Sequence, residues 1–194
     1  MLQTTFVFYS KSANAKPGKG VHEYIDASQV SNYEPLSLEP DWRKVLSNFD
    51  ISPFEFEGKT YQTIEHVFQA KKLAIADPSQ AERFTVESGD PIGLGDGAMA
   101  QKHRKLVKLT LAQLEQWDHI KRDVMERAAR QKFAEICWGA VWSRQIAPFA
   151  QSPDKLRILK LTEGAKLVHL MTARGQKSTL DHFDHLERIR RDTH

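Results

Sequence analysis

The stretch that decides the fold is Thr63-Ile64-Glu65-His66-Val67-Phe68-Gln69-Ala70-Lys71-Lys72. An α-helix turns by about 100° per residue, so Glu65, Gln69 and Lys72 would line one narrow stripe. Most other positions of the stretch are apolar, which is typical of a buried helix. A polar stripe on such a helix faces a cleft, or it is an ordinary solvated face with weak ion-pair support. Geometry alone leaves both interpretations open.

The protonation state of Glu65 is the second open point. Thr63 is suited to cap the helix, which places Glu65 in its first turn. There the helix dipole favours the ionised carboxylate, whereas burial favours the neutral acid. Ionised, Glu65 would stabilise positive charge or act as a base; neutral, it would act as an acid.

Length and composition predict one globular domain over residues 1–194. Of these residues, 40% are hydrophobic and 27% are charged. No apolar run approaches a membrane span and no secretory signal precedes Phe6, so we expect a cytoplasmic protein with no membrane partner. The one cysteine, Cys137, lies in an apolar segment and is predicted to be a buried structural thiol in a reducing compartment.

Basic residues cluster in two places. Residues 11–20 carry three lysines and no acid, and residues 102–108 form a second cluster. Both clusters are predicted to be solvated surface or to hold phosphates, although the glycines of the first match neither a P-loop nor a dinucleotide-binding spacing. The net charge of +3 is too mild to indicate a structural DNA-binding protein, and no recognisable reading helix is present.

The periodicity predicts an α+β fold, predominantly helical, with a small sheet or hairpin in the N-terminal half. Alternation predicts a strand over residues 4–10 and a hairpin over residues 54–61. A turn at residues 93–97 is expected to precede the next helix. Helical spacing predicts helices over 98–114, 117–136, 156–169 and 180–191.

Several motifs, in order along the chain, are similar to the NADAR/YbiA-like family of N-glycosidases. They are Phe8-Tyr9-Ser10, Leu46-Ser47-Asn48-Phe49, Glu65-His66 with Phe68-Gln69-Ala70 and Lys72, Trp117 with Val124-Met125 and Lys132-Phe133, and Ala165-Lys166-Leu167-Val168. The resemblance runs with gaps from about Phe8 to Val168. It favours the longer eukaryotic and viral-like subgroup, because a Lys/Gly-rich insertion occupies about residues 11–43.

The chain departs from the bacterial pattern after residue 168. Bacterial members continue with an acidic residue and a Trp-Gly-Asp-Gly stretch, whereas His169-Leu170-Met171 and then Arg174-Gly175-Gln176-Lys177 follow here. Any function of that acidic loop, substrate choice above all, is therefore not carried over. No motif with metal-ligand spacing appears, and neither a metal nor a cofactor is expected.

The chemistry that the resemblance implies is cleavage of the bond between ribose C1 and a base nitrogen. The reaction builds positive charge on the sugar, which a nearby carboxylate stabilises. A second route is attack by a desolvated lysine, which opens the ribose and forms an imine. We therefore expect Glu65 and Lys72 to be catalytic. They would lie about 10 Å apart along a helix and could both border a ribose-sized pocket, while the lysines of residues 11–20 compete for the amine role.

The resemblance also implies substrate-binding residues. The amide of Asn48 suits a sugar hydroxyl and Trp117 suits stacking on a flat base, whereas turn closure and core packing are the alternatives. The predicted set is Ser10, Lys11, Lys16, Lys19, Asn48, Phe49, Gln69 and Trp117.

Two substrate classes follow from the resemblance. One is ADP-ribose attached to guanine, free or within DNA or RNA; the other is the phosphoribosylamino-pyrimidine intermediates of riboflavin synthesis. The lysines of the insertion suit a diphosphate better than a single phosphate, so the first is preferred. A non-catalytic module that binds ADP-ribose or nucleotides is a different class of function, and it would not require Glu65 to be an acid.

Overall fold

The computed structural model describes residues 2–134, 155–171 and 177–193. It confirms the predicted α+β class, with helices predominating and with small sheets. The chain divides into two compact units, which are Met1–Ser47 together with Pro153–His194 (unit 1) and Asn48–Ser152 (unit 2). That residues 1–194 form a single domain stays a prediction. No helix in the described ranges is both long and apolar enough to cross a lipid bilayer.

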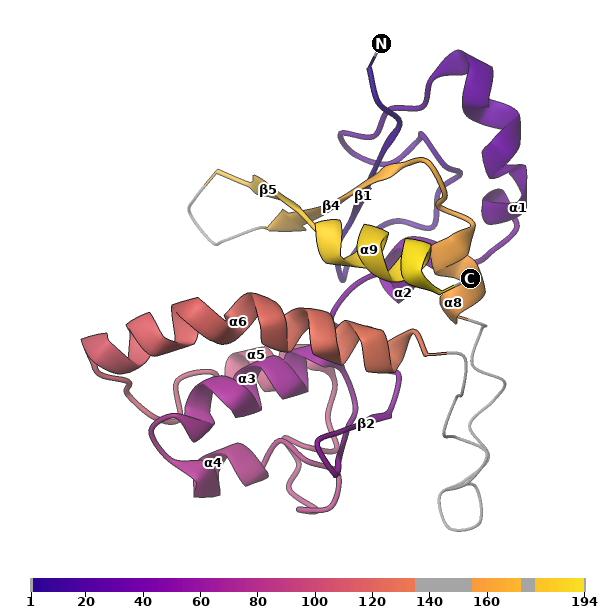
Figure 1. Ribbon diagram of the computed structural model, residues 1–194. Coiled ribbons are helices and arrows are strands. Elements are labelled where there is room, and N and C mark those ends of the chain that lie inside the picture. Colours follow the sequence, from indigo (N-terminus) through magenta and orange to yellow (C-terminus); the bar gives the residue numbers. More distant parts are fainter. Residues whose placement is uncertain (1, 135–154, 172–176, 194) are drawn as a thin grey trace, which may run out of the picture. The chain divides into compact units, whose positions relative to one another are not determined.

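Unit 1 is built on a sheet of three strands. They are β1 (Thr5–Phe8), β4 (Lys166–Met171) and β5 (Thr179–His182), with β4 in the centre (Figure 1). β4 runs parallel to β1 and antiparallel to β5. The predicted strand at residues 4–10 is therefore confirmed, and its side chains Phe6 and Phe8 are fully buried.

Two predicted helices of unit 1 are only partly confirmed, because each range also contains a strand. Residues 156–169 form the short helix α8 (Lys155–Lys160) and then strand β4, because Gly164 takes a left-handed conformation (φ 78°) and ends the helical region. Residues 180–191 begin as strand β5, and only then form helix α9 (Asp184–Asp192). Short apolar runs fit both helical and strand periods, and here pairing with β1 decides for the strand.

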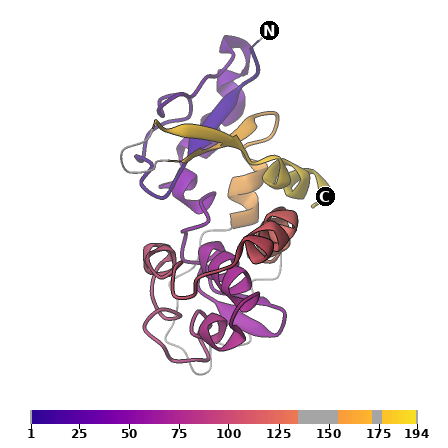
Figure 2. The same cartoon turned by 90° about the vertical axis from the view of Figure 1, so that its left-hand side faces the viewer.

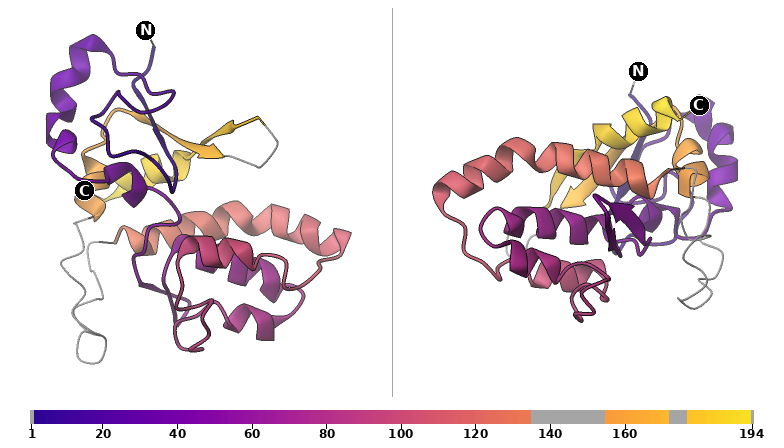
Figure 3. Two further views of the ribbon diagram at one scale, coloured as in Figure 1. Left: turned by 180° about the vertical axis from the view of Figure 1, so that it is seen from behind. Right: turned by 60° about the horizontal axis from the view of Figure 1, so that its bottom comes forward.

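Short helices occupy residues 27–37 and 42–45, mostly within the predicted insertion of about residues 11–43. They are η1 (Ala27–Tyr33), α1 (Glu34–Ser37) and α2 (Trp42–Val45), seen from behind in Figure 3. Phe6 of β1 meets the rings of Tyr33 and Trp42 edge to face, with centroids 4.9 and 5.1 Å apart. These aromatic contacts attach the segment to the sheet. α9 packs on β4, and α8 contacts both α9 and α2.

Unit 2 begins with the predicted hairpin, which is confirmed as β2 (Phe54–Phe56) and β3 (Lys59–Tyr61) in antiparallel pairing. Its turn residues, Glu57 and Gly58, have φ values of 50° and 75°, as a tight two-residue hairpin turn requires. The hairpin leads into helix α3 (Ile64–Ala74), which confirms the helix predicted from residues 63–72.

α3 is the central helix of unit 2. α4 (Pro78–Glu82), α5 (Gly97–Lys102) and α6 (Leu111–Lys132) all contact it (Figures 2 and 3). The helix predicted over 98–114 is instead two pieces: α5 ends at Lys102, and α6 begins at Leu111. Thr110 caps α6 with a reciprocal bond to Gln113, so α6 starts before the predicted residue 117. Cys137 and the predicted end of that helix at residue 136 lie outside the described residues.

Candidate functional site

The N-terminus of α3 is fixed by Thr63 and His66. The Thr63 hydroxyl accepts the backbone N–H of His66 at 3.2 Å, which confirms Thr63 as the helix cap. The His66 ring is fully buried, with Nδ1 2.8 Å from the Thr63 hydroxyl and Nε2 2.9 Å from the Ile92 carbonyl. A carbonyl only accepts, so Nε2 donates to Ile92 and Nδ1 accepts from Thr63. Burial lowers the pKa of His66, consistent with this neutral ring.

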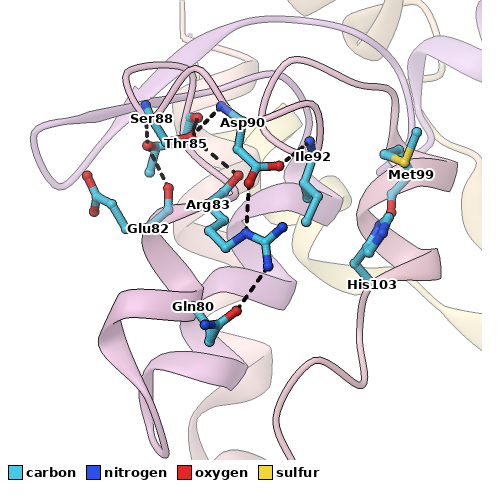
Figure 4. Close-up of polar contacts among 9 residues, drawn as sticks. All are labelled: Gln80, Glu82, Arg83, Thr85, Ser88, Asp90, Ile92, Met99 and His103. Carbon is cyan, nitrogen blue, oxygen red and sulfur yellow. Dashed lines mark hydrogen bonds and ion pairs between the residues drawn. The ribbon is translucent and has the colours of Figure 1, made fainter.

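The loop that presents the Ile92 carbonyl has its own polar network (Figure 4). The Asp90 carboxylate accepts hydrogen bonds from the Arg83 guanidinium at 2.7 Å and from the backbone N–H of Ile92 at 2.8 Å. The Ser88 hydroxyl donates to the Thr85 carbonyl at 2.7 Å. A Cβ at position 93 would lie 2.0 Å from the Thr85 carbonyl oxygen, so only glycine fits there. His66 therefore bonds to a firmly held loop.

Glu65 is a buried carboxyl with few hydrogen bonds to offset its loss of contact with water. Only 7% of the residue is exposed, and its carboxyl oxygen accepts one hydrogen bond from a described residue, the amide of Gln69 at 2.7 Å. Burial raises the pKa of Glu65, and this effect exceeds the opposing effects of the Gln69 bond and of the charges on Arg104 and Lys72. Burial is thus the largest influence on the Glu65 carboxyl, and it favours the neutral acid.

Gln69 has an unused acceptor beside this carboxyl. The residue is 5% exposed, and its Oε1 atom is buried without a hydrogen-bond partner among the residues that the structure describes. Buried polar atoms nearly always have a hydrogen-bond partner in folded proteins, so this oxygen is a candidate acceptor for a hydrogen bond that a ligand donates. Glu65 and Gln69 together offer a carboxyl and a free carbonyl to a hydroxylated ligand.

Lys72 is half-buried near the end of α3 and lines a pocket of about 360 Å³. We call it the basic pocket; its lining residues are Lys72, Arg104, Lys105, Val107, Lys108, Leu109 and Leu114. The predicted basic cluster at residues 102–108 thus meets Lys72, the last residue of the polar stripe of α3, whereas Glu65 and Gln69 do not line this pocket. The charges of both Arg104 and Lys72 act to lower the pKa of Glu65, so the buried carboxyl interacts electrostatically with two residues of this pocket.

Asn48 positions Glu65 through its backbone. The Asn48 carbonyl accepts the Glu65 N–H at 3.0 Å, which satisfies one of the free donors at the start of α3. The Asn48 side chain is buried and donates to the Met125 sulfur at 3.7 Å. Phe49 packs against Gly97, where a Cβ would lie 2.8 Å from the Phe49 Cα atom. Sugar binding by Asn48 and Phe49 stays a prediction.

Trp117 packs in the interior of unit 2. It is 4% exposed, and its ring meets Phe68 of α3 edge to face with centroids 4.7 Å apart. This is the packing arrangement that composition predicts. Stacking of a base on Trp117 stays a prediction and would require the surrounding side chains to move.

Ser10, Lys11, Lys16 and Lys19 are exposed on unit 1, whereas the other predicted residues belong to unit 2. The structure thus gathers the predicted set into two groups, one on each unit. A hollow of about 420 Å³ also lies on unit 1, lined by residues that include Tyr33, and it contains none of the predicted residues.

The loop that carries these lysines is held by a buried ion pair that the sequence did not reveal. The Glu23 and Arg43 side chains are 0% and 3% exposed and lie 2.6 Å apart. Glu23 also accepts the backbone N–H groups of Val7, Gly18 and Gly20 at 2.9 to 3.2 Å. Arg43 donates further to the carbonyls of Ala15 and Lys16. No periodic signal connects residues 20 positions apart in an irregular segment.

In the described part of the chain, no group of three or more His, Cys, Asp or Glu side chains could hold a metal ion.

The fold and the site together define a small α+β protein. Its helix α3 carries a buried carboxyl with one hydrogen bond from a described residue, and Lys72 of the same helix lines a basic pocket. No protein-family model matches the chain. Curated relatives are the N-glycosidases YbiA of Shigella boydii serotype 4 (strain Sb227) and Shigella sonnei (strain Ss046), each 30% identical over 90 residues. The matched region is 46% of this chain and 49% of each relative, so the chain spans about half the length of these relatives.

These relatives confirm the predicted resemblance to the NADAR/YbiA-like N-glycosidase family. Among solved structures, an NMR structure of the E. coli protein YbiA is similar to this chain with a TM-score of 0.49 and 19% identity. The similarity covers 99% of this chain and 86% of that one.

Proposed function

We propose that this chain is an N-glycosyl hydrolase that cleaves the bond between ribose C1 and a base nitrogen, and that it removes ADP-ribose from guanine. The observation that carries the proposal is the Glu65 carboxyl, which is 7% exposed and has Gln69 as its hydrogen-bond partner among the described residues. The similarity to N-glycosidases YbiA supports the reaction class.

The role of Glu65 follows from the charge that develops on the sugar. Glycosidic cleavage passes through an oxocarbenium-like transition state, and a carboxylate stabilises it most strongly where water is excluded. The raised pKa of Glu65 also brings it closer to neutral pH, where a carboxyl can transfer a proton to or from the reacting groups. Either role requires the carboxyl itself rather than an amide of the same shape.

Gln69 and Lys72 complete the proposed site on α3. The free Oε1 of Gln69 would accept a ribose hydroxyl and so orient the sugar against Glu65. Lys72 is the candidate amine for an imine route on this unit. Reducing a mixture of protein and substrate with borohydride and weighing the protein tests that route; without a covalent adduct on any lysine, the imine is ruled out.

The direct test of the proposal is turnover of ADP-ribosylated guanosine. We expect the wild-type chain to release ADP-ribose, and Glu65→Gln to lose about 10²- to 10⁴-fold in rate, the range typical of general acid or base groups. Glu115→Gln is the matched control, because Glu115 is exposed on α6 and carries the same substitution away from the site.

Two results would overturn the proposal or its substrate. Consumption of phosphoribosylamino-pyrimidines without release of ADP-ribose would reverse the order of the two substrate classes. Binding of ADP-ribose without turnover of either substrate would instead identify a non-catalytic binding module. In that case Glu65→Gln would leave the affinity for ADP-ribose unchanged and there would be no rate to lose.

A further inference from the structure

We infer that the basic pocket binds the phosphoryl group carried by the ribose of the substrate, and that Lys72 is one of the cations that hold it, a role that replaces that of the attacking amine. The inference rests on the proposed function for the identity of the sugar. It adds a binding site on unit 2, on the same helix as Glu65, and it names the chemistry that this site recognises.

The first support is an excess of positive charge. Four of the seven lining residues are basic and none is acidic. None of Lys72, Arg104, Lys105 and Lys108 forms a salt bridge within the described parts of the chain; Arg104 donates to the Gln101 carbonyl at 3.0 Å. Four cations around one pocket repel each other, and an anion bound there relieves the repulsion.

The second support is the rigidity of the pocket walls. The segment between α5 and α6 is anchored at its start, where Nδ1 of His103 donates to the Met99 carbonyl at 2.9 Å (Figure 4). At its end, Thr110 caps α6, and Gln113 donates to the Ile75 carbonyl at 3.3 Å just beyond α3. The backbone of this segment is therefore anchored at both ends, beside the helix that carries Lys72.

The third support is the chemistry of the lining. An Arg guanidinium matches two phosphoryl oxygens at once, and lysine ammonium groups add charge from any direction. Val107, Leu109 and Leu114 supply apolar wall, which lowers the local dielectric and strengthens the attraction. A volume of about 360 Å³ lies within the range of small-molecule sites.

The fourth support is the link to Glu65. Arg104 is the cation with the larger effect on the pKa of Glu65, and Lys72 comes second. Lys72 lies seven residues after Glu65 on α3, roughly 10 Å along the helix axis. A ribose with its reacting C1 at Glu65 would direct its phosphorylated end toward the basic pocket. The phosphoryl group can come from a ribose 5-phosphate or from the diphosphate of ADP-ribose.

Calorimetric titration of the full chain tests the inference, with ADP-ribose, ribose 5-phosphate and ribose as ligands. We expect the phosphorylated ligands to bind more tightly than ribose, and Arg104→Gln with Lys108→Gln to weaken their binding about tenfold or more. Lys72→Gln should weaken it as well, and Lys72→Arg should restore part of the affinity. Binding of ADP-ribose alone would assign the diphosphate as the source, and binding of both would show that one phosphoryl group suffices.

Lys102→Gln is the matched control, because Lys102 is an exposed lysine of the same basic cluster that does not line the pocket. The inference is overturned if the Arg104 and Lys108 changes leave the affinities unchanged, if Lys102→Gln weakens them equally, or if only a single-stranded oligonucleotide binds. Thermal melting of each variant checks that it is folded.

The two proposals fail in different ways. If phosphorylated ligands bind at the basic pocket but no substrate is turned over, the inference stands and the hydrolase proposal fails. If ADP-ribose is released and the Arg104 and Lys108 changes leave KM unchanged, the hydrolase proposal stands and the inference fails.

Discussion

Glu23 of unit 1 and Glu65 of unit 2 are both buried carboxylates, but their surroundings are opposite. Glu23 receives three backbone N–H groups and the guanidinium of Arg43. Glu65 receives one amide from the described residues, and that amide belongs to a side chain whose own oxygen is unpaired. The comparison teaches that burial alone does not mark a functional acid; the number of partners separates a structural carboxylate from one available to a ligand.

The largest expected effect tests the structural side of the comparison. Arg43→Met leaves Glu23 buried without its counter-charge and should lower the free energy of unfolding by about 3–5 kcal/mol. Urea denaturation measures the loss. Lys44→Met is the control, because Lys44 pairs with Asp41 at the surface and should change the free energy by about 0–1 kcal/mol. Equal losses in the two variants would refute the role of the buried pair.

A second prediction extends the contrast to two histidines, the fully buried His66 and the half-buried His169. Burial lowers the pKa of His169 to about 4, and its Nδ1 has no partner among the described residues, whereas both ring nitrogens of His66 are bonded. The unfolded chain therefore takes up more protons than the folded chain below about pH 6.5, and stability falls as the pH drops toward 4.

His169→Phe is expected to flatten this acid-induced loss, since His169 lies among the rings of Phe8 and Phe183 and a phenyl ring has no proton to bind. The measurement is the free energy of unfolding from pH 7 to pH 4, with the wild-type chain alongside. An unchanged slope in the variant would show that His169 is not the titrating group.

A third prediction concerns the cap that positions Glu65. Thr63→Ala removes the acceptor for the His66 N–H and the partner of the His66 ring, and should cost about 1 kcal/mol of stability. Thr63→Ser keeps the hydroxyl and should retain most of it. If alanine and serine destabilise the chain equally, the hydroxyl is not the stabilising group.

The smallest expected effect is on stability and concerns Glu65, the carboxyl that we propose to be functional. A carboxyl whose pKa is raised by folding contributes stability below its ordinary pKa of about 4.3, and this contribution is lost as the pH rises through the folded pKa. Glu65→Gln should therefore make the chain slightly more stable at pH 7, and the gain should shrink toward acid pH. Glu115→Gln should show no such trend. A variant less stable than wild type at pH 7 would mean that the Glu65 charge is compensated after all.

The local parts of this picture could be predicted from the sequence. Thr63 as a cap, the helix from Ile64 and the hairpin with Glu57-Gly58 rest on contacts between near neighbours in the chain. The strand at 166–171 could not be predicted, because its period is ambiguous and its pairing partner lies at the far end of the chain.

The site was predictable only as a list of residues. Lys72 of the predicted stripe and the basic cluster at residues 102–108 were both visible, but only the fold brings them to one pocket, which Glu65 and Gln69 do not line. The unpaired oxygen of Gln69 and the partners of Glu23 depend on three-dimensional packing. Residues 172–176, within the stretch where the chain departs from the bacterial pattern, lie outside the described ranges.

The most direct measurement is the pH dependence of kcat/KM for release of ADP-ribose, recorded together with the titration of the Glu65 carboxyl carbon by NMR. The account predicts a Glu65 midpoint above about 4.3, with one limb of the rate profile following that midpoint. A Glu65 midpoint at or below the ordinary value, or a rate profile whose limbs do not follow it, would contradict the account.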